Sequence, residues 1–95
     1  MYYLIYVSFD PSASLYENNV IDFHNSGMAF DTLEEAQEYI KEDLVINMKE
    51  EASEGMVGLD EIDVEYHQRG DKVTLDAFYD EELILRYECW IMKSL

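Results

Sequence analysis

Basic residues are the scarcest feature of this 95-residue chain. Six lysines and arginines stand against 22 aspartates and glutamates, which gives a net charge of −16 with histidine neutral. Nucleic acids and anionic lipid surfaces are bound by clusters of basic side chains. The composition therefore excludes direct nucleic-acid binding and electrostatic attachment to a membrane.

Cysteine and long apolar runs are also scarce. The single cysteine, Cys89, has no partner for an internal disulfide, which favours a reducing compartment. No apolar run approaches the roughly 20 residues of a membrane-spanning helix. The segment Tyr2–Phe9 lacks the basic flank of a signal peptide. We expect a single cytoplasmic domain over residues 1–95.

Catalytic and metal-binding motifs are absent as well. The four glycines, at positions 27, 55, 58 and 70, form no phosphate-binding pattern. The acidic run 60–65 lacks the glycine and the ligand spacing of a calcium loop. His24, His67 and Cys89 lack the paired spacing of zinc ligands. We expect no enzyme activity, no cofactor and no metal site.

Apolar residues are plentiful enough for a folded core, at 48% hydrophobic and 14% aromatic. Residues 2–9 are apolar at both alternating positions, which predicts a strand near the sheet centre, covered on both sides. Asp10-Pro11-Ser12 predicts a turn after it. Residues 20–24 predict a second strand, which Asn25-Ser26-Gly27 would end.

An amphipathic helix is predicted from about residue 32 to about residue 50. Thr32 and Glu35 form a T-x-x-E capping box, in which each side chain accepts a hydrogen bond from a free backbone N–H. At about 100° per residue, one side of the helix is apolar and the opposite side is acidic. The apolar stripe consists of Leu33, Ala36, Ile40, Leu44 and Met48.

Three strands are predicted after the helix, at residues 62–67, 73–79 and 83–93. Turns at 69–72 and 80–82 separate them. Residues 83–93 also match a helical period, but their β-branched and aromatic content favours a strand. The order β(β)αβββ predicts an α+β fold, with an antiparallel sheet of four to five strands and one long amphipathic helix packed on one face.

Negative charge is concentrated in residues 31–65, where thirteen acids accompany only Lys41 and Lys49, a net charge of −11. Glu34, Glu38 and Glu42 recur every four residues, so their carboxylates step along the helix by about 6 Å. Like charges at this spacing destabilise a helix slightly, which favours a functional explanation. The alternative is a solvated face that serves solubility alone.

Apolar residues near this acidic face add a second signal, because apolar anchors beside steering charges suit a protein–protein interface. Tyr39 and Ile46 are one helical repeat apart on the polar side, with Val45 between them. Acids of the following strand extend the charge. The predicted partner-binding residues are Glu34, Glu35, Glu38, Tyr39, Glu42, Ile46, Asp63 and Glu65.

In length, acidity and lack of catalytic motifs the chain resembles the small acidic inhibitors of phages and mobile elements, without a shared motif. Some of these mimic nucleic acid and block restriction enzymes, CRISPR effectors or DNA-repair enzymes. The resemblance implies a non-enzymatic inhibitor whose partner is a basic nucleic-acid-binding protein, with Glu34, Glu38 and Glu42 in place of phosphates. The alternative is an acidic protein–protein interaction module or a homo-oligomer, for example a homodimer, without mimicry.

Overall fold

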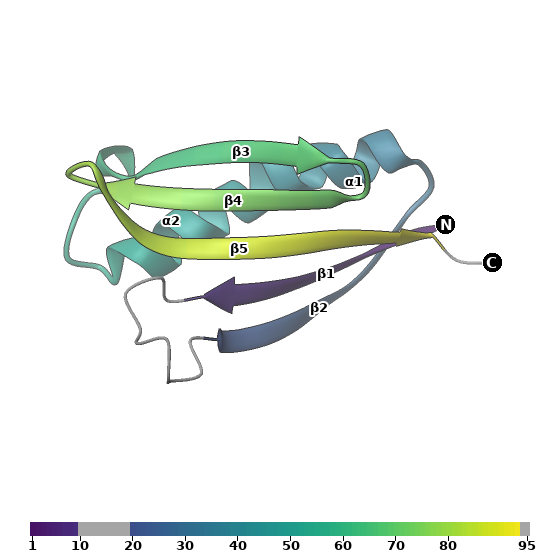
Figure 1. The fold of residues 1–95 in the computed structure, drawn as a ribbon, viewed down its shortest axis with the longest axis horizontal. Coiled ribbons are helices and arrows are strands. Elements are labelled where there is room, and N and C mark those ends of the chain that lie inside the picture. Colours follow the sequence, from purple (N-terminus) through teal and green to yellow (C-terminus); the bar gives the residue numbers. More distant parts are fainter. Residues whose placement is uncertain (10–19, 94–95) are drawn as a thin grey trace.

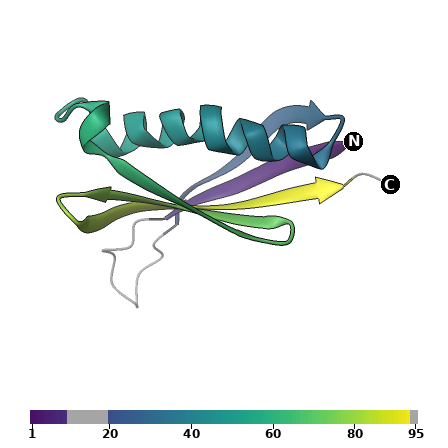
Figure 2. The same cartoon turned by 90° about the horizontal axis from the view of Figure 1, so that it is seen from above.

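The computed structural model describes residues 1–9 and 20–93, with side chains described for 1–9 and 29–93. Five antiparallel strands form one sheet in the order β2-β1-β5-β4-β3 (Figure 1). A single helical rod connects β2 to β3 and covers one face of the sheet (Figure 2). This confirms the predicted α+β fold. The strands are β1 (Tyr2–Phe9), β2 (Val20–Phe30), β3 (Asp63–Arg69), β4 (Lys72–Tyr79) and β5 (Glu82–Lys93).

The helical rod consists of α1 (Leu33–Tyr39), a π-helical turn η1 (Ile40–Leu44) and α2 (Val45–Ser53). Its start confirms the predicted capping box. The Thr32 hydroxyl accepts the Glu35 N–H at 3.1 Å, and the Glu35 carboxylate accepts the Asp31 N–H at 3.2 Å. The rod ends later than predicted, at a left-handed Glu54 with φ 50°. No described helix is long and apolar enough to cross a membrane.

The π turn keeps the apolar stripe aligned with the sheet. Residues four apart on an α-helix of 3.6 residues per turn drift around the axis by about 40° per step. A π turn closes its hydrogen bonds over five residues and therefore offsets part of this drift. Ala36, Ile40, Leu44 and Met48, which are spaced four apart on both sides of the turn, are all fully buried.

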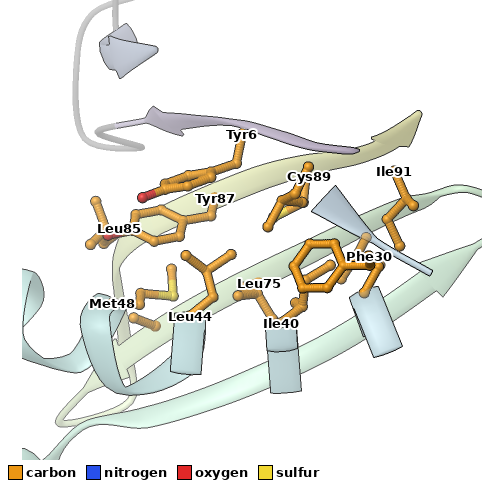
Figure 3. Close-up of a cluster of buried hydrophobic side chains, with 14 of the residues drawn as sticks. Tyr6, Phe30, Ile40, Leu44, Met48, Leu75, Leu85, Tyr87, Cys89 and Ile91 are labelled. Atoms are coloured by element: carbon orange, nitrogen blue, oxygen red, sulfur yellow. The ribbon is translucent and has the colours of Figure 1, made fainter. Parts of the chain in front are cut away.

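The core lies between this stripe and the covered face of the sheet (Figure 3). The Tyr6 and Tyr87 rings lie 5.1 Å apart under the helix. Cys89 is buried beside them. Its burial, together with the charge of Glu88, raises the pKa of the thiol to about 12, so Cys89 is a packing residue. The labelled core includes Phe30, Leu75, Leu85 and Ile91.

Strand β1 is an inner strand, as predicted, and among the described elements only the helical rod covers one of its faces. The helix covers one face of the sheet, and no described element covers the other, which we call the open face (Figure 2). Ile5, Val7 and Phe9 point toward the open face, because successive strand residues alternate between faces. Val7 is nevertheless buried, so the apolar run in β1 is partly buried on the open face as well.

Strand β2 continues through its predicted end at residues 25–27 and reaches Phe30. Tyr3 pairs with Ala29 and Ile5 with Asn25, so three β2 residues lie opposite one β1 residue. This bulge absorbs the turn-forming residues without ending the strand. The turn predicted at residues 10–12 lies outside the described residues.

The second half of the sheet agrees with the prediction. A two-residue turn, Gly70-Asp71, joins β3 to β4, and its left-handed φ of 62° suits the glycine. Asp80 and Glu81 join β4 to β5 with φ values of 51° and 66°. Residues 83–93 lie in β5, the central strand, so the helical alternative for this segment is wrong.

Candidate partner-binding surface

The outer side of the helix presents a regular line of side chains. Glu34, Glu38, Glu42, Ile46 and Glu50 follow one another at four-residue steps, and all five are exposed. Each is two residues from a member of the buried stripe, which corresponds to about 200° around the axis. We call these five residues the outer row; it faces away from the sheet.

Among the described residues, the carboxylates of the helix layer have no cationic partners. Eleven acids and two lysines lie between residues 31 and 62. In the part of the chain that the structure describes, none of these acids forms an ion pair. The Lys41 ammonium instead lies over the Tyr66 ring, 5.1 Å from its centroid. The negative charge of this layer is therefore not neutralised locally.

The structure brings together only part of the predicted site. Ile46 is 52% exposed within the outer row, as a partner contact requires. Tyr39 is half-buried and its ring packs on Phe30, with centroids 5.4 Å apart, so it belongs to the core rather than to an exposed patch. Glu35 is exposed, but its carboxylate already caps the helix.

Asp63 and Glu65 lie apart from the outer row. Both belong to the edge strand β3, where Val64 and Tyr66 point toward the core. Alternation places Asp63 and Glu65 on the open face, on the other side of the sheet from the helix. The sequence analysis extended the acidic surface to them, although their alternation with Val64 and Tyr66 places them on the side of β3 away from the helix.

The open face gathers basic residues that the sequence analysis missed. Arg69, Lys72 and Arg86, three of the six lysines and arginines, line a shallow hollow of about 580 Å³ together with His67. They come from β3, β4 and β5. These residues lie close together because of the register between the strands: Arg69 of β3 pairs with Lys72 of β4, and Asp76 of β4 pairs with Arg86 of β5. The hairpin turn predicted at 69–72 already places Arg69 opposite Lys72, whereas no local sequence pattern brings Arg86 to them.

Acids of the same face form ion pairs with two of these bases, Arg86 and Lys72. The Arg86 guanidinium donates to Asp76 at 2.6 and 3.3 Å, and Asp76 is buried. This hydrogen bonding, with the charges of Asp76 and Glu88, raises the pKa of Arg86. The Lys72 ammonium lies 3.5 Å from Glu88. The open face therefore has little excess charge to bind an anion.

The described residues offer no metal site. No group of three or more His, Cys, Asp or Glu side chains among them is arranged to hold a metal ion. His67 lies on the open face, 3.3 Å from Glu65, whereas Cys89 lies in the core beneath the helix. The side chain of His24 is outside the described residues.

Comparison with known protein families finds no match, and comparisons with curated proteins and with solved structures find none either. The geometry of the chain itself therefore carries the functional argument.

Proposed function

We propose that this chain is a non-enzymatic acidic inhibitor that competes with nucleic acid for the basic groove of a nucleic-acid-binding protein. The observation that carries the proposal is the outer side of the helix, where carboxylates without ion pairs follow a straight, rigid rod. Candidate targets are restriction enzymes, CRISPR effectors and DNA-repair enzymes, which act in the cytoplasm of a bacterial host.

The density of charge along the rod supports mimicry. Nine carboxylates lie between residues 31 and 54. At 1.5 Å per residue, this segment is about 35 Å long, so it has roughly one carboxylate per 4 Å. One strand of duplex DNA has about one phosphate per 3.4 Å. These carboxylates are distributed around the rod, and along the outer row alone Glu34, Glu38 and Glu42 are about 6 Å apart, so a groove that fits a phosphate strand would meet a line of charge about half as dense as that of DNA.

The distance between the bases of the open face and the acids of the outer row further supports mimicry. Arg69, Lys72 and Arg86 lie on the open face, with the sheet and core between them and the outer row. They are too far around the molecule to neutralise the row. Such a one-sided field steers a basic partner toward the helix and raises the association rate.

A second candidate function is that of an acidic interaction module without mimicry. The exposed Ile46 in the middle of the outer row favours it, because an apolar anchor contributes affinity that salt does not weaken. The two functions differ in salt dependence. The Debye length falls from about 10 Å at 0.1 M to about 3 Å at 1 M salt, so electrostatic mimicry weakens steeply over this range.

The test uses a panel of purified restriction enzymes, CRISPR effectors and DNA-repair enzymes. We expect the protein to inhibit at least one of them, to compete with its duplex DNA, and to lose affinity as salt is raised. The variant Glu34→Gln/Glu38→Gln/Glu42→Gln should lose inhibition of that enzyme. Lysate proteins retained on the immobilised chain, and eluted by duplex DNA, extend the panel.

A matched control isolates the helix. Asp71→Asn/Asp80→Asn/Glu81→Gln changes the net charge equally, from −16 to −13, but in the two hairpin turns. It should keep most of its inhibition, because exposed charges beyond a Debye length from the contact are screened. Equal losses in both variants would mean that bulk charge alone matters. A partner whose affinity is flat with salt would favour the interaction module.

A further inference from the structure

A second hollow, of about 480 Å³, lies at one end of the molecule between the exit of α2 and the β4–β5 hairpin. Figure 1 shows both elements at the same end, away from the marked chain termini. Apolar side chains of the helix exit and of the hairpin line it, among them Met56, Val57, Tyr79 and Leu83. The hollow is separate from the outer row.

Apolar groups at this hollow are open to solvent. Met56 is 82% exposed and Tyr79 is 39% exposed. Exposed apolar groups around a concavity typically mark a site where another molecule binds. The opposite end of the sheet offers a useful contrast, because Tyr3 and Met92, paired neighbours there, are 42% and 50% exposed but line neither hollow.

The wall of the hollow is acidic. Glu51, Glu54 and Glu82 contribute to it, and none of the described residues that line it is basic. The buried Tyr87 hydroxyl donates to the Glu51 carboxylate, which holds that carboxylate at the wall. A ligand that enters the hollow therefore meets apolar surface at its centre and fixed negative charge around it.

Both sides of the hollow are built on unusual backbone. Glu54, Asp80 and Glu81 are the only described non-glycine residues with positive φ. Side chains other than glycine adopt this left-handed region rarely. Left-handed residues are what a two-residue hairpin turn and a helix end require, so these positions define the border of the hollow. Here all three lie in the two turns that border the hollow.

We infer that this hollow docks a basic segment of a protein partner, with one large apolar side chain in the hollow and lysines or arginines against Glu51, Glu54 and Glu82. Charge complementarity selects this occupant. A second copy of the chain would bring its own charge of −16 against the same carboxylates. The inference goes beyond the proposed function, because it concerns another surface and needs no nucleic-acid-binding groove.

Two fluorescein-labelled nonapeptides test the inference by fluorescence anisotropy in 150 mM salt. One has a central tryptophan between four lysines on each side, and the other has glycine at the centre. We expect the tryptophan peptide to bind about tenfold more tightly, the ratio that a modest apolar anchor produces. Amide shifts in a ¹⁵N spectrum should cluster at residues 52–57 and 79–84. Equal affinities, or shifts confined to residues 34–46, would overturn the inference.

Matched variants locate the anchor. Met56→Ser/Tyr79→Ser should lower the affinity for the tryptophan peptide about tenfold. Met92→Ser/Tyr3→Ser removes the same side-chain types at the other end of the sheet and should change that affinity less than twofold. Glu54→Gln/Glu82→Gln should lower the affinity for both peptides more than Glu34→Gln/Glu38→Gln does. Equal effects within either pair of variants would place the peptide elsewhere and overturn the inference.

Sedimentation velocity tests the competing occupant. We expect a monomer at 100 µM protein; a dimer that Met56→Ser/Tyr79→Ser dissociates would assign the hollow to a second copy and overturn the inference. These outcomes are independent of the proposed function. That function fails when the Glu34→Gln/Glu38→Gln/Glu42→Gln variant still inhibits its target, and this result leaves the peptide measurements unaffected.

Discussion

The outer side of the helix and the open face of the sheet differ in whether their charged side chains form ion pairs. On the helix, Glu34, Glu38 and Glu42 form no described ion pair. On the open face, Arg86 and Lys72 each lie beside a carboxylate of a neighbouring strand. Residues 31–62 of the helix layer therefore carry a net charge of −9 without a described ion pair, whereas the open face pairs two of its bases with carboxylates.

This difference separates two roles of charge. A fixed ion pair such as Arg86–Asp76 uses its charges inside the fold, where they specify strand register and neutralise each other. A row without partners does nothing for the fold, because like charges four residues apart repel. Its charge remains available to a partner, and this is why the helix, rather than the sheet, carries the proposed function.

The largest expected effect concerns packing on the two faces. Leu44→Ala or Ile40→Ala should lower the free energy of unfolding by about 2–5 kcal/mol, because each leaves a cavity under the helix. Ile5→Ala, on the open face, should cost about 1 kcal/mol, because Ile5 is half-buried. Urea unfolding measures both. Equal costs would show that a further layer covers the open face in solution.

The next effect tests whether the open-face ion pair belongs to the fold. Asp76→Asn should lower the free energy of unfolding by about 1–2 kcal/mol, because it removes the charged partner of a fork-shaped hydrogen bond. Glu38→Gln on the helix should cost nothing. Urea midpoints compare the two substitutions. An Asp76→Asn protein as stable as the parent would remove the contrast between the two surfaces.

Local patterns predicted much of this fold. The capping box at Thr32 and the stripe through Ile40 and Leu44 depend on residues within one or two helical turns, so the sequence contains them directly. The same holds for the alternation in 73–79 and for the Gly70 turn. The outer row follows from the stripe, since it occupies the opposite side.

Features that depend on tertiary contacts were not predictable. The π turn at 40–44 keeps the apolar stripe of the helix in contact with the sheet. The β2 bulge arises from the register in which β2 pairs with β1. Arg86 lies beside Arg69 and Lys72 only because β5 is paired with β4. Tyr39 is part of the core because its ring packs on the ring of Phe30. Apart from the Arg69–Lys72 pair, which lies across one hairpin turn, each involves contacts between different secondary-structure elements.

A smaller effect appears at alkaline pH, on the covered side of β5. Burial, with the charge of Glu88, raises the pKa of Cys89 from 9.0 to about 12, and burial raises that of Tyr87 as well. Above pH 9 the unfolded chain loses these protons while the native state keeps them. The free energy of unfolding should therefore fall as pH rises from 9 toward 12, with Cys89 contributing about 1 kcal/mol by pH 10.

Cys89→Ala provides the control for the pH effect. Its free energy of unfolding, measured in urea at pH 8, 9 and 10, should fall less steeply than that of the parent. Iodoacetamide should alkylate Cys89 slowly in the native protein and rapidly in urea. Identical slopes for the two proteins would show that the thiol ionises alike in the native and unfolded states, and hence that this position is open to water.

The smallest effect tests the spacing of the outer row itself. Glu34→Gln/Glu38→Gln/Glu42→Gln should raise the free energy of unfolding by a few tenths of a kcal/mol, because two like-charge contacts at four-residue spacing are relieved. Asp71→Asn/Asp80→Asn/Glu81→Gln makes the same change from −16 to −13 without that spacing, so it reports the contribution of net charge alone. Urea unfolding at 20 mM and 500 mM salt separates the two, since added salt screens the repulsion and should erase the advantage of the helix variant. Equal gains in both variants at low salt would mean that the regular spacing carries no local strain. The outer row would then be an ordinary solvated face, and its contrast with the open face would be one of charge number rather than arrangement.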